Sequence, residues 1–122
     1  MGSPQFDSMY MTLTAGATAA AYTRVKIDSS GLVQVAAATD VSIGYLTDSG
    51  MVSGQSCVVR LNGIPTNAVA AGAIVVGAKC FAQASGKVDD TDPGTAVVVG
   101  IALTEAAANN DVVTILRPDY VS

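Results

Sequence analysis

The segment Ile43–Thr47 (IGYLT) has a counterpart in Val99–Thr104 (VGIALT), and this recurrence decides the fold. Ser30–Gly31 is repeated in the same way at Ser85–Gly86, which lies 55 residues further along the chain. Similarity at a nearly constant separation indicates a structural unit that occurs more than once. The chain is therefore predicted to hold two similar units of roughly 50 residues, each too small to be stable alone.

Short β-branched and aromatic runs, separated by turn residues about every 8 to 12 positions, predict that both units consist of strands. Helix signals are weak, because Ala17–Ala21 and Glu105–Asn109 are too short to show an apolar stripe, although the second could form one helical turn. We expect an all-β chain, a compact β-sandwich or β-barrel-like domain made of two similar units with little helix. The predicted strands are Tyr10–Thr14, Tyr22–Ile27, Leu32–Ala36, Val41–Thr47, Ser56–Asn62, Ala73–Val76, Lys79–Gln83, Val97–Thr104 and Val112–Leu116.

Four glycines are predicted to have special backbone roles. Gly31 and Gly86 end turn sequences and are expected at positive φ. Gly44 and Gly100 occupy matching places inside predicted strands, where a glycine indicates a bulge or a close approach of two backbones.

The apolar composition is dominated by small side chains. The 122 residues include 20 Ala and 17 Val, against 2 Phe, 4 Tyr and no Trp. Such a core buries little area per residue, at roughly 25 cal/mol per Å², so we expect a partner chain to cover part of the apolar surface. Along the chain we expect a flexible leader or cloning scar at 1–8, an N-terminal arm or edge strand at 9–21, one β domain with an internal duplication at 22–118, and a tail at 119–122.

Several function classes are excluded by composition. The chain has no His, which removes a His base, a Ser-His or Cys-His pair and a His metal ligand. The net charge is −4 and the six cations are scattered, which argues against nucleic acid as a partner. The longest apolar run is far shorter than the ~20 residues of a membrane span, and no signal peptide is visible. Cys57 and Cys80 are interpreted as buried reduced thiols, with a disulfide or a reactive thiol as the alternative.

Two motifs come close to a known site without completing it. Gly72–Lys79 resembles a phosphate-binding loop, but its Lys is one residue late and the following Ser/Thr is absent. Asp89–Asp92 places three carboxylates within four residues, yet it lacks the Glu and Gly spacing of a calcium loop. We therefore expect no enzyme activity, no cofactor and no metal.

Aromatic and arginine side chains are the candidates for an interface. The four tyrosines are expected partly at contacts and partly in the core, while the two arginines near the ends of matching strands are either ion-pair anchors or charges that protect a sheet edge. Met9–Gly16 alternates between apolar and polar side chains and has no proline, so it is predicted to contact another chain. Deletion of residues 1–16 is predicted to abolish binding to this partner and to leave the β fold intact. The candidate interface residues are Tyr10, Met11, Leu13, Tyr22, Tyr45, Arg60, Arg117 and Tyr120.

The segments Gly63–Pro65, Gly77–Lys79, Ser85–Val88 and Val99–Ala107 resemble the small capsid decoration proteins of tailed bacteriophages, also called cement or head-stabilising proteins. The similarity covers about Thr12 to Pro118. Where that family usually has a glycine after the alanine run, this chain has Asn109–Asn110, so we expect an Asn at positive φ there.

The resemblance implies an all-β protein that is made in the host cytoplasm and binds the outer surface of an icosahedral capsid. Its partners would be the major capsid protein and further copies of itself, most often as a trimer, with a dimer as the alternative. It implies no catalytic residue and no cofactor. Two rival functions stay open: another phage head or tail part, such as the base of a head fibre, and a small carbohydrate-binding β-sandwich.

Overall fold

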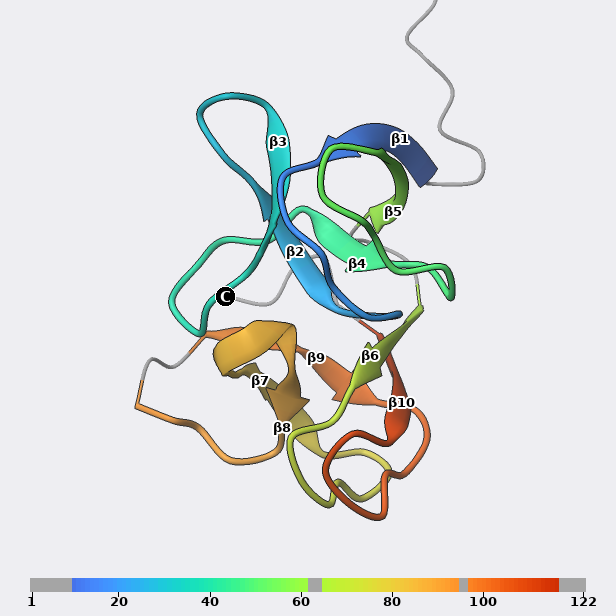
Figure 1. Cartoon of the computed structure of the whole chain (residues 1–122). Helices are drawn as coiled ribbons and strands as arrows, with labels where there is room; N and C mark the ends of the chain where they lie inside the picture. Colours follow the sequence, from blue (N-terminus) through green and yellow to red (C-terminus); the bar gives the residue numbers. More distant parts are fainter. Residues whose placement is uncertain (1–9, 62–64, 95–96, 117–122) are drawn as a thin grey trace, which may run out of the picture.

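The computed structural model describes residues 10–61, 65–94 and 97–116, and it confirms the all-β prediction. Figure 1 shows two lobes stacked on each other, with β1–β5 in the upper lobe and β6–β10 in the lower one. The strands are β1 (Tyr10–Ala15), β2 (Arg24–Ile27), β3 (Leu32–Val35), β4 (Gly44–Leu46), β5 (Ser56–Leu61), β6 (Thr66–Val69), β7 (Lys79–Ala82), β8 (Val88–Asp89), β9 (Val98–Ala102) and β10 (Val112–Leu116).

The first half is a closed barrel in the order β1-β3-β2-β4-β5. β1 closes it, because it pairs antiparallel with β5 over five residues and parallel with β3 at Thr14–Leu32 and Ala15–Val33. A closed barrel leaves few unpaired backbone groups, which allows strands as short as β4 to be stable.

The second half is a five-stranded sheet in the order β6-β10-β9-β7-β8, and its pairing repeats that of the first half. Each strand matches the one five places earlier, and the parallel bridge Ala70–Val88 stands where Ala15 pairs with Val33. Backbone hydrogen bonds repeat as well: Leu46 N–H donates to Thr23 C=O, and Ala102 N–H donates to Ala78 C=O. The prediction of two similar β units is confirmed.

Positive-φ residues occur at matching places in both halves. Gly31 and Gly86 have φ values of 82° and 71°. Gly54 (φ 84°) is matched by Asn110 (φ 77°), so the expected turn with Asn at positive φ is present. The N–H of each of these two residues donates a 2.8 Å hydrogen bond, to Ala15 C=O and Ala70 C=O respectively. An Asn can take the left-handed conformation at lower cost than most residues, which explains how it replaces glycine here.

Both predicted strand glycines have the expected surroundings. A Cβ added to Gly44 would lie 2.1 Å from the carbonyl oxygen of Arg60, so β4 approaches β5 as closely as only glycine allows. At Gly100 the pairing between β7 and β9 shifts register, because Cys80 faces Gly100 whereas Phe81 faces Val98. Such a shift is a β-bulge.

Some strand predictions were wrong. The predicted strand Ala73–Val76 is a loop that contributes only the isolated bridge between Ile74 and Ala106. Strands β6 and β8 were not predicted, because their apolar residues are mixed with Asn and Asp. Glu105–Asn109 forms no helical turn, and the described helix is instead a 3₁₀ turn at Ala84–Gly86. No helix among the described residues has the length and apolar character of a membrane span.

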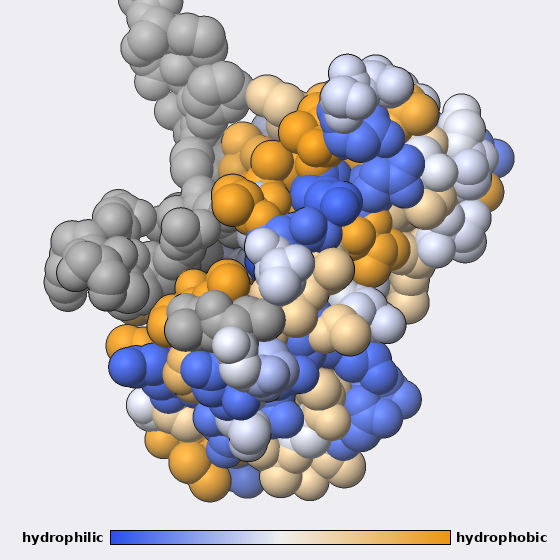
Figure 2. Space-filling model, turned by 90° about the vertical axis from the view of Figure 1, so that its left-hand side faces the viewer, coloured by the Kyte–Doolittle hydropathy of each residue, from blue (hydrophilic) through white to orange (hydrophobic). Residues whose placement is uncertain are grey.

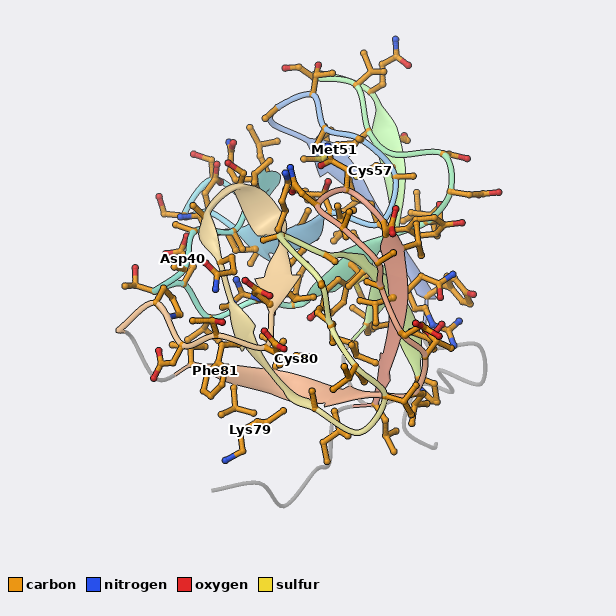
Figure 3. The ribbon with its side chains drawn as sticks, turned by 90° about the horizontal axis from the view of Figure 1, so that it is seen from below. Asp40, Met51, Cys57, Lys79, Cys80 and Phe81 are labelled. Atoms are coloured by element: carbon orange, nitrogen blue, oxygen red, sulfur yellow. The ribbon has the colours of Figure 1, made fainter. Side chains whose placement is uncertain are left out.

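Each half has its own core, and the side chain of Tyr45 from the first half belongs to the core of the second. The buried residues of the first core are Ala15, Val25, Val33, Leu46, Met51, Cys57 and Val59. Figure 3 shows Met51 and Cys57 at the same end of the molecule. The second core is made largely of Ala and Val from β6 to β10, but it also contains Tyr45 from β4 of the first half. Tyr45 therefore fills space that the small residues of the second half leave open.

The two cysteines are free and buried in different cores, in agreement with the sequence interpretation. Burial raises the pKa of both thiols, in the case of Cys80 to about 11, with the carboxylates of Asp90 and Asp89 adding to the effect of burial. A thiol with a raised pKa carries little thiolate at neutral pH and reacts slowly.

The N-terminal segment is part of the fold. Ala15 lies in the first core and β1 closes the barrel, so the expectation that residues 1–16 can be deleted without loss of the fold is wrong. Among the described residues, however, the Tyr10–Leu13 part of β1 pairs only with β5, since the pairing with β3 involves Thr14 and Ala15. This stretch has the geometry of an edge strand, not of an arm.

Asp28 organises the turn between β2 and β3, and its charge makes stability depend on pH. Its carboxylate accepts hydrogen bonds from the N–H groups of Ser30 and Leu32 and from Gln34 Nε2. The Gln34 bond first, and then the backbone bonds, lower the pKa of Asp28 below its usual value. A carboxyl with a lowered pKa in the folded state stabilises the fold above its unfolded pKa, near 3.9, and this contribution is lost as pH falls through the folded pKa.

We therefore expect the stability of Asp28→Asn to fall less than that of the wild type when the pH drops below about 4, because asparagine does not titrate. Chemical unfolding from pH 2.5 to 7 measures this change. The expected result is that the wild type and the variant differ most at neutral pH and converge in acid. A difference that stays constant across this range would contradict the role given to the carboxylate.

Candidate interaction surface

A row of aromatic and cationic side chains crosses the first half. Tyr10 pairs with Arg60 across β1 and β5, and Arg60 pairs with Tyr45 across β5 and β4. Tyr45 in turn pairs with Arg24 across β4 and β2. Directly paired residues project from the same face of a sheet, so the register places all four on the outer face of the barrel. We call Arg24, Tyr45 and Arg60 the first row.

Arg60 connects this row to the start of the second half. Its Nε and Nη2 groups donate hydrogen bonds of 2.9 and 2.6 Å to the carbonyl oxygen of Pro65, which precedes β6. Its Nη1 group donates to the hydroxyl of Tyr10, and the guanidinium carbon lies 5.2 Å from the centre of the Tyr10 ring. The planar guanidinium is thus held by an aromatic ring and by the backbone of the other half.

The other end of the row is buried between the halves. Arg24 is 1% exposed and donates from Nη1 to Ala37 C=O at 3.1 Å and from Nη2 to Asp40 C=O. Asp40 also forms a 2.8 Å ion pair with Lys26, which, together with a hydrogen bond from Ala37 N–H, lowers its pKa. Tyr45 is 2% exposed, so its prediction as a contact residue on the molecular surface was wrong. It is a contact residue between the two halves of the chain.

A cleft of about 370 Å³ opens where the first row emerges between the halves. Thr114 Oγ1 donates a 2.8 Å hydrogen bond to Asn67 Oδ1 in its wall, which fixes the second-half side. The cleft unites three predicted residues, Tyr10, Tyr22 and Arg60, with polar groups that sequence reasoning missed, namely Asp48, Asn67 and Thr114. It therefore offers aromatic faces, a cation, a carboxylate and amide groups to a protein loop or another polar ligand.

The remaining predicted interface residues are distributed as follows. Met11 is 36% exposed at the edge part of β1, whereas Leu13 is half-buried against the first core. Arg117 and Tyr120 lie outside the described residues. In the described part of the chain no group of three or more Cys, Asp or Glu residues is arranged to hold a metal ion.

The second half presents an apolar row that was not predicted. Lys79 pairs with Ile101 and Ile101 pairs with Leu116, in the register that Arg24, Tyr45 and Arg60 have in the first half. Ile101 and Leu116 are 39% and 36% exposed. The alignment of Gly44-Tyr45 with Gly100-Ile101 contained the signal for this row, since it gives both residues the same place in the fold.

The comparisons with known proteins concern the fold. No protein-family model matches the sequence, and no curated protein matches it. A similar solved structure is the crystal structure of the N base of head fiber gp8.5 in bacteriophage phi29, with a TM-score of 0.73 and 20% sequence identity. The match covers 89% of this chain and 92% of that chain. The two proteins therefore share one fold over nearly their whole lengths.

Proposed function

We propose that this chain is a structural protein of a tailed-phage virion that attaches to the outer surface of the icosahedral capsid. The observation that carries the proposal is the fold shared with a head-fiber base over nearly the whole of both chains. The motifs that resemble capsid decoration proteins lead independently to the same class of function. The protein would either stabilise the capsid directly or serve as the base of a longer surface fibre.

The construction of the chain suits such a role. A closed barrel and a second sheet of the same design give a rigid body, and the Asp28 turn and the Arg24–Asp40 contacts fix its loops. On the face drawn in Figure 2, hydrophobic and hydrophilic residues are interspersed over both lobes, an arrangement suited to several moderate contacts. Many copies, each in contact with more than one capsid subunit, convert moderate affinities into stable attachment. The proposed mechanism is non-covalent bridging and involves no bond chemistry.

The cleft beside Arg60 is the proposed contact with the major capsid protein. Arginine and tyrosine are enriched at the centres of protein interfaces, because both combine apolar area with directed hydrogen bonds. The proposed assembly contains several copies of the chain, with a trimer as the favoured form. In that form each copy would present one such cleft toward the capsid lattice.

Co-sedimentation with capsids of the encoding phage that lack this protein tests the proposal. The wild-type chain should bind at saturating stoichiometry and raise the temperature at which the capsid opens. Arg60→Ala should weaken binding about tenfold or more, as expected for a central interface residue. Val52→Ala, which shortens an exposed side chain elsewhere, should bind like the wild type. A chain that is folded but does not associate with capsids would refute the proposal.

A carbohydrate-binding module is the second candidate, and the two tyrosines in the cleft favour it. Sugars commonly stack on aromatic faces and form hydrogen bonds with Asp, Asn and Arg, all of which line this cleft. Binding to a glycan array that is lost in Tyr22→Ala, together with absence of capsid binding, would support this candidate over the first.

A further inference from the structure

The two halves contact each other through different parts of the shared design. The first half contributes the face that carries the first row. From this row Tyr45 enters the core of the second half, and β4 contacts β6. The second half thus contributes β6, its first strand. In the described part of the chain β6 pairs with β10 on one side, and its other side has only the bridge at Ala70. The contact is heterologous: a row from one unit packs against the first strand of the next.

The second half carries an equivalent row that is uncovered. We call Lys79, Ile101 and Leu116 the second row. Their register reproduces that of the first row. Leu103 lies two residues after Ile101 along the chain and is 44% exposed. In Figure 3 Lys79 points away from the body of the protein, whereas Cys80 lies on the inner side of the sheet. Where the first row has the 2% exposed Tyr45, the second row has the 39% exposed Ile101.

The first half carries an uncovered equivalent of β6. That equivalent is β1, which pairs with β5 as β6 pairs with β10. Over Tyr10–Leu13 the other edge of β1 has no strand partner among the described residues, and Tyr10 and Met11 are 39% and 36% exposed. The contact between the halves has two components, a row of side chains and a first strand. Each chain therefore carries a second example of both on its surface, namely the second row and β1.

We propose that the second row of one copy packs against the edge of β1 in a second copy. In this arrangement β9 contacts β1 of the next copy as β4 contacts β6 within one chain. The inference rests on the self-association included in the proposed function, and it names the two surfaces involved. A heterologous contact of this kind forms a ring if its rotation closes, and a trimer is one such ring.

A second copy is the favoured occupant because of the internal template. The contact already formed within the chain shows that a row of this design can pack against a first strand of this design. An exposed Ile–Leu pair and a strand edge without a partner are moreover features that folded proteins cover or block, since both otherwise promote uncontrolled association. Association of copies in a closed ring covers every row and every edge.

Light scattering after gel filtration tests the proposal with the isolated full chain. The wild type should be an oligomer. Ile101→Glu should weaken self-association about tenfold or more, and the new carboxylate faces Lys79 across the strands, which favours retention of the fold. Met11→Glu should have a similar effect from the other side of the contact. Val52→Glu introduces the same charge at an exposed position outside both surfaces and should leave the oligomer intact. Circular dichroism checks that each variant is folded.

Mixing the two interface variants separates this arrangement from others. Ile101→Glu keeps an intact β1 edge and Met11→Glu keeps an intact second row, so the mixture should form a pair of two chains that neither variant forms alone. A two-fold contact of row against row would leave Met11→Glu oligomeric, and that result would overturn the proposal. A wild-type chain that stays monomeric at high concentration would overturn it too.

Capsid co-sedimentation of the same variants keeps the two proposals apart. A chain that self-associates as described but ignores capsids would refute only the proposed function. A monomeric wild-type chain whose capsid binding is lost in Ile101→Glu would show that the second row contacts the capsid protein, which would refute only the arrangement proposed here.

Discussion

Tyr45→Ala is expected to lower the free energy of unfolding by about 3–5 kcal/mol, the range measured when large buried aromatic side chains are truncated. Tyr45 is 2% exposed and joins a core built mostly from Ala and Val. These small side chains cannot move far enough to fill the resulting cavity, so the second half loses both buried area and a contact with the first half. For a chain of this size the melting temperature should fall by roughly 10–20 °C.

Tyr10→Ala is the matched control for this experiment. It removes the same side chain from the other side of Arg60, which pairs with both tyrosines, and there the tyrosine is 39% exposed. Its loss removes the contact with Arg60 and should lower stability by about 1 kcal/mol or less. Both variants are compared with the wild type by calorimetry and by urea unfolding. Equal losses in the two variants would show that Tyr45 does not bridge the halves.

Gly86→Ala is expected to destabilise the chain by about 2–4 kcal/mol, because it combines backbone strain with a steric clash. Gly86 has a φ of 71°, and a Cβ added there would lie 2.4 Å from Thr23 Cγ2 and 2.8 Å from the carbonyl oxygen of Arg24. Both atoms belong to the first half. Gly86 N–H also donates a 3.0 Å hydrogen bond to Ala36 C=O, so the alanine would push the two halves apart at a point where they are joined.

The repeat supplies the control for this substitution. Gly31 is the equivalent residue of the first half, with a φ of 82°, but no atom lies within 4 Å of a Cβ added there. Gly31→Ala should therefore show the backbone strain alone, about 1–2 kcal/mol. Urea unfolding gives the free energy of unfolding of both variants, and the difference between their losses is the cost of the clash. If the two alanines destabilise the chain equally, the close packing of the 3₁₀ turn against β2 contributes nothing to stability.

The sequence was informative wherever one residue type has one backbone role. Glycine at matching places predicted the turns at Gly31 and Gly86 and the close approach at Gly44, because few other residues can occupy such positions. The recurrence of whole segments predicted two similar β units, which the shared strand pairing confirms. These features are local, so they can be derived without knowledge of the three-dimensional arrangement.

Features that depend on packing between the halves could not be derived in this way. Strand β6 carries Thr66 and Asn67 and has no strong β pattern of its own, since its place is set by pairing with β10. Tyr45 is buried and Ile101 is exposed because of which half covers the other, and nothing in their local sequence decides that. The sequence predicted the tyrosines partly at contacts and partly in the core, and only the fold shows that Tyr45 makes its contact within the chain.

The presence of Tyr45 in the second core implies an order of folding. The first half closes its own barrel with a core that contains only its own residues, and it leaves the ribosome first. The second half completes its interior only when that tyrosine is already in position. We expect the earlier segment to act as a scaffold for the later one, so that pulse-labelling by hydrogen exchange during refolding should protect β2 and β5 before β7 and β9.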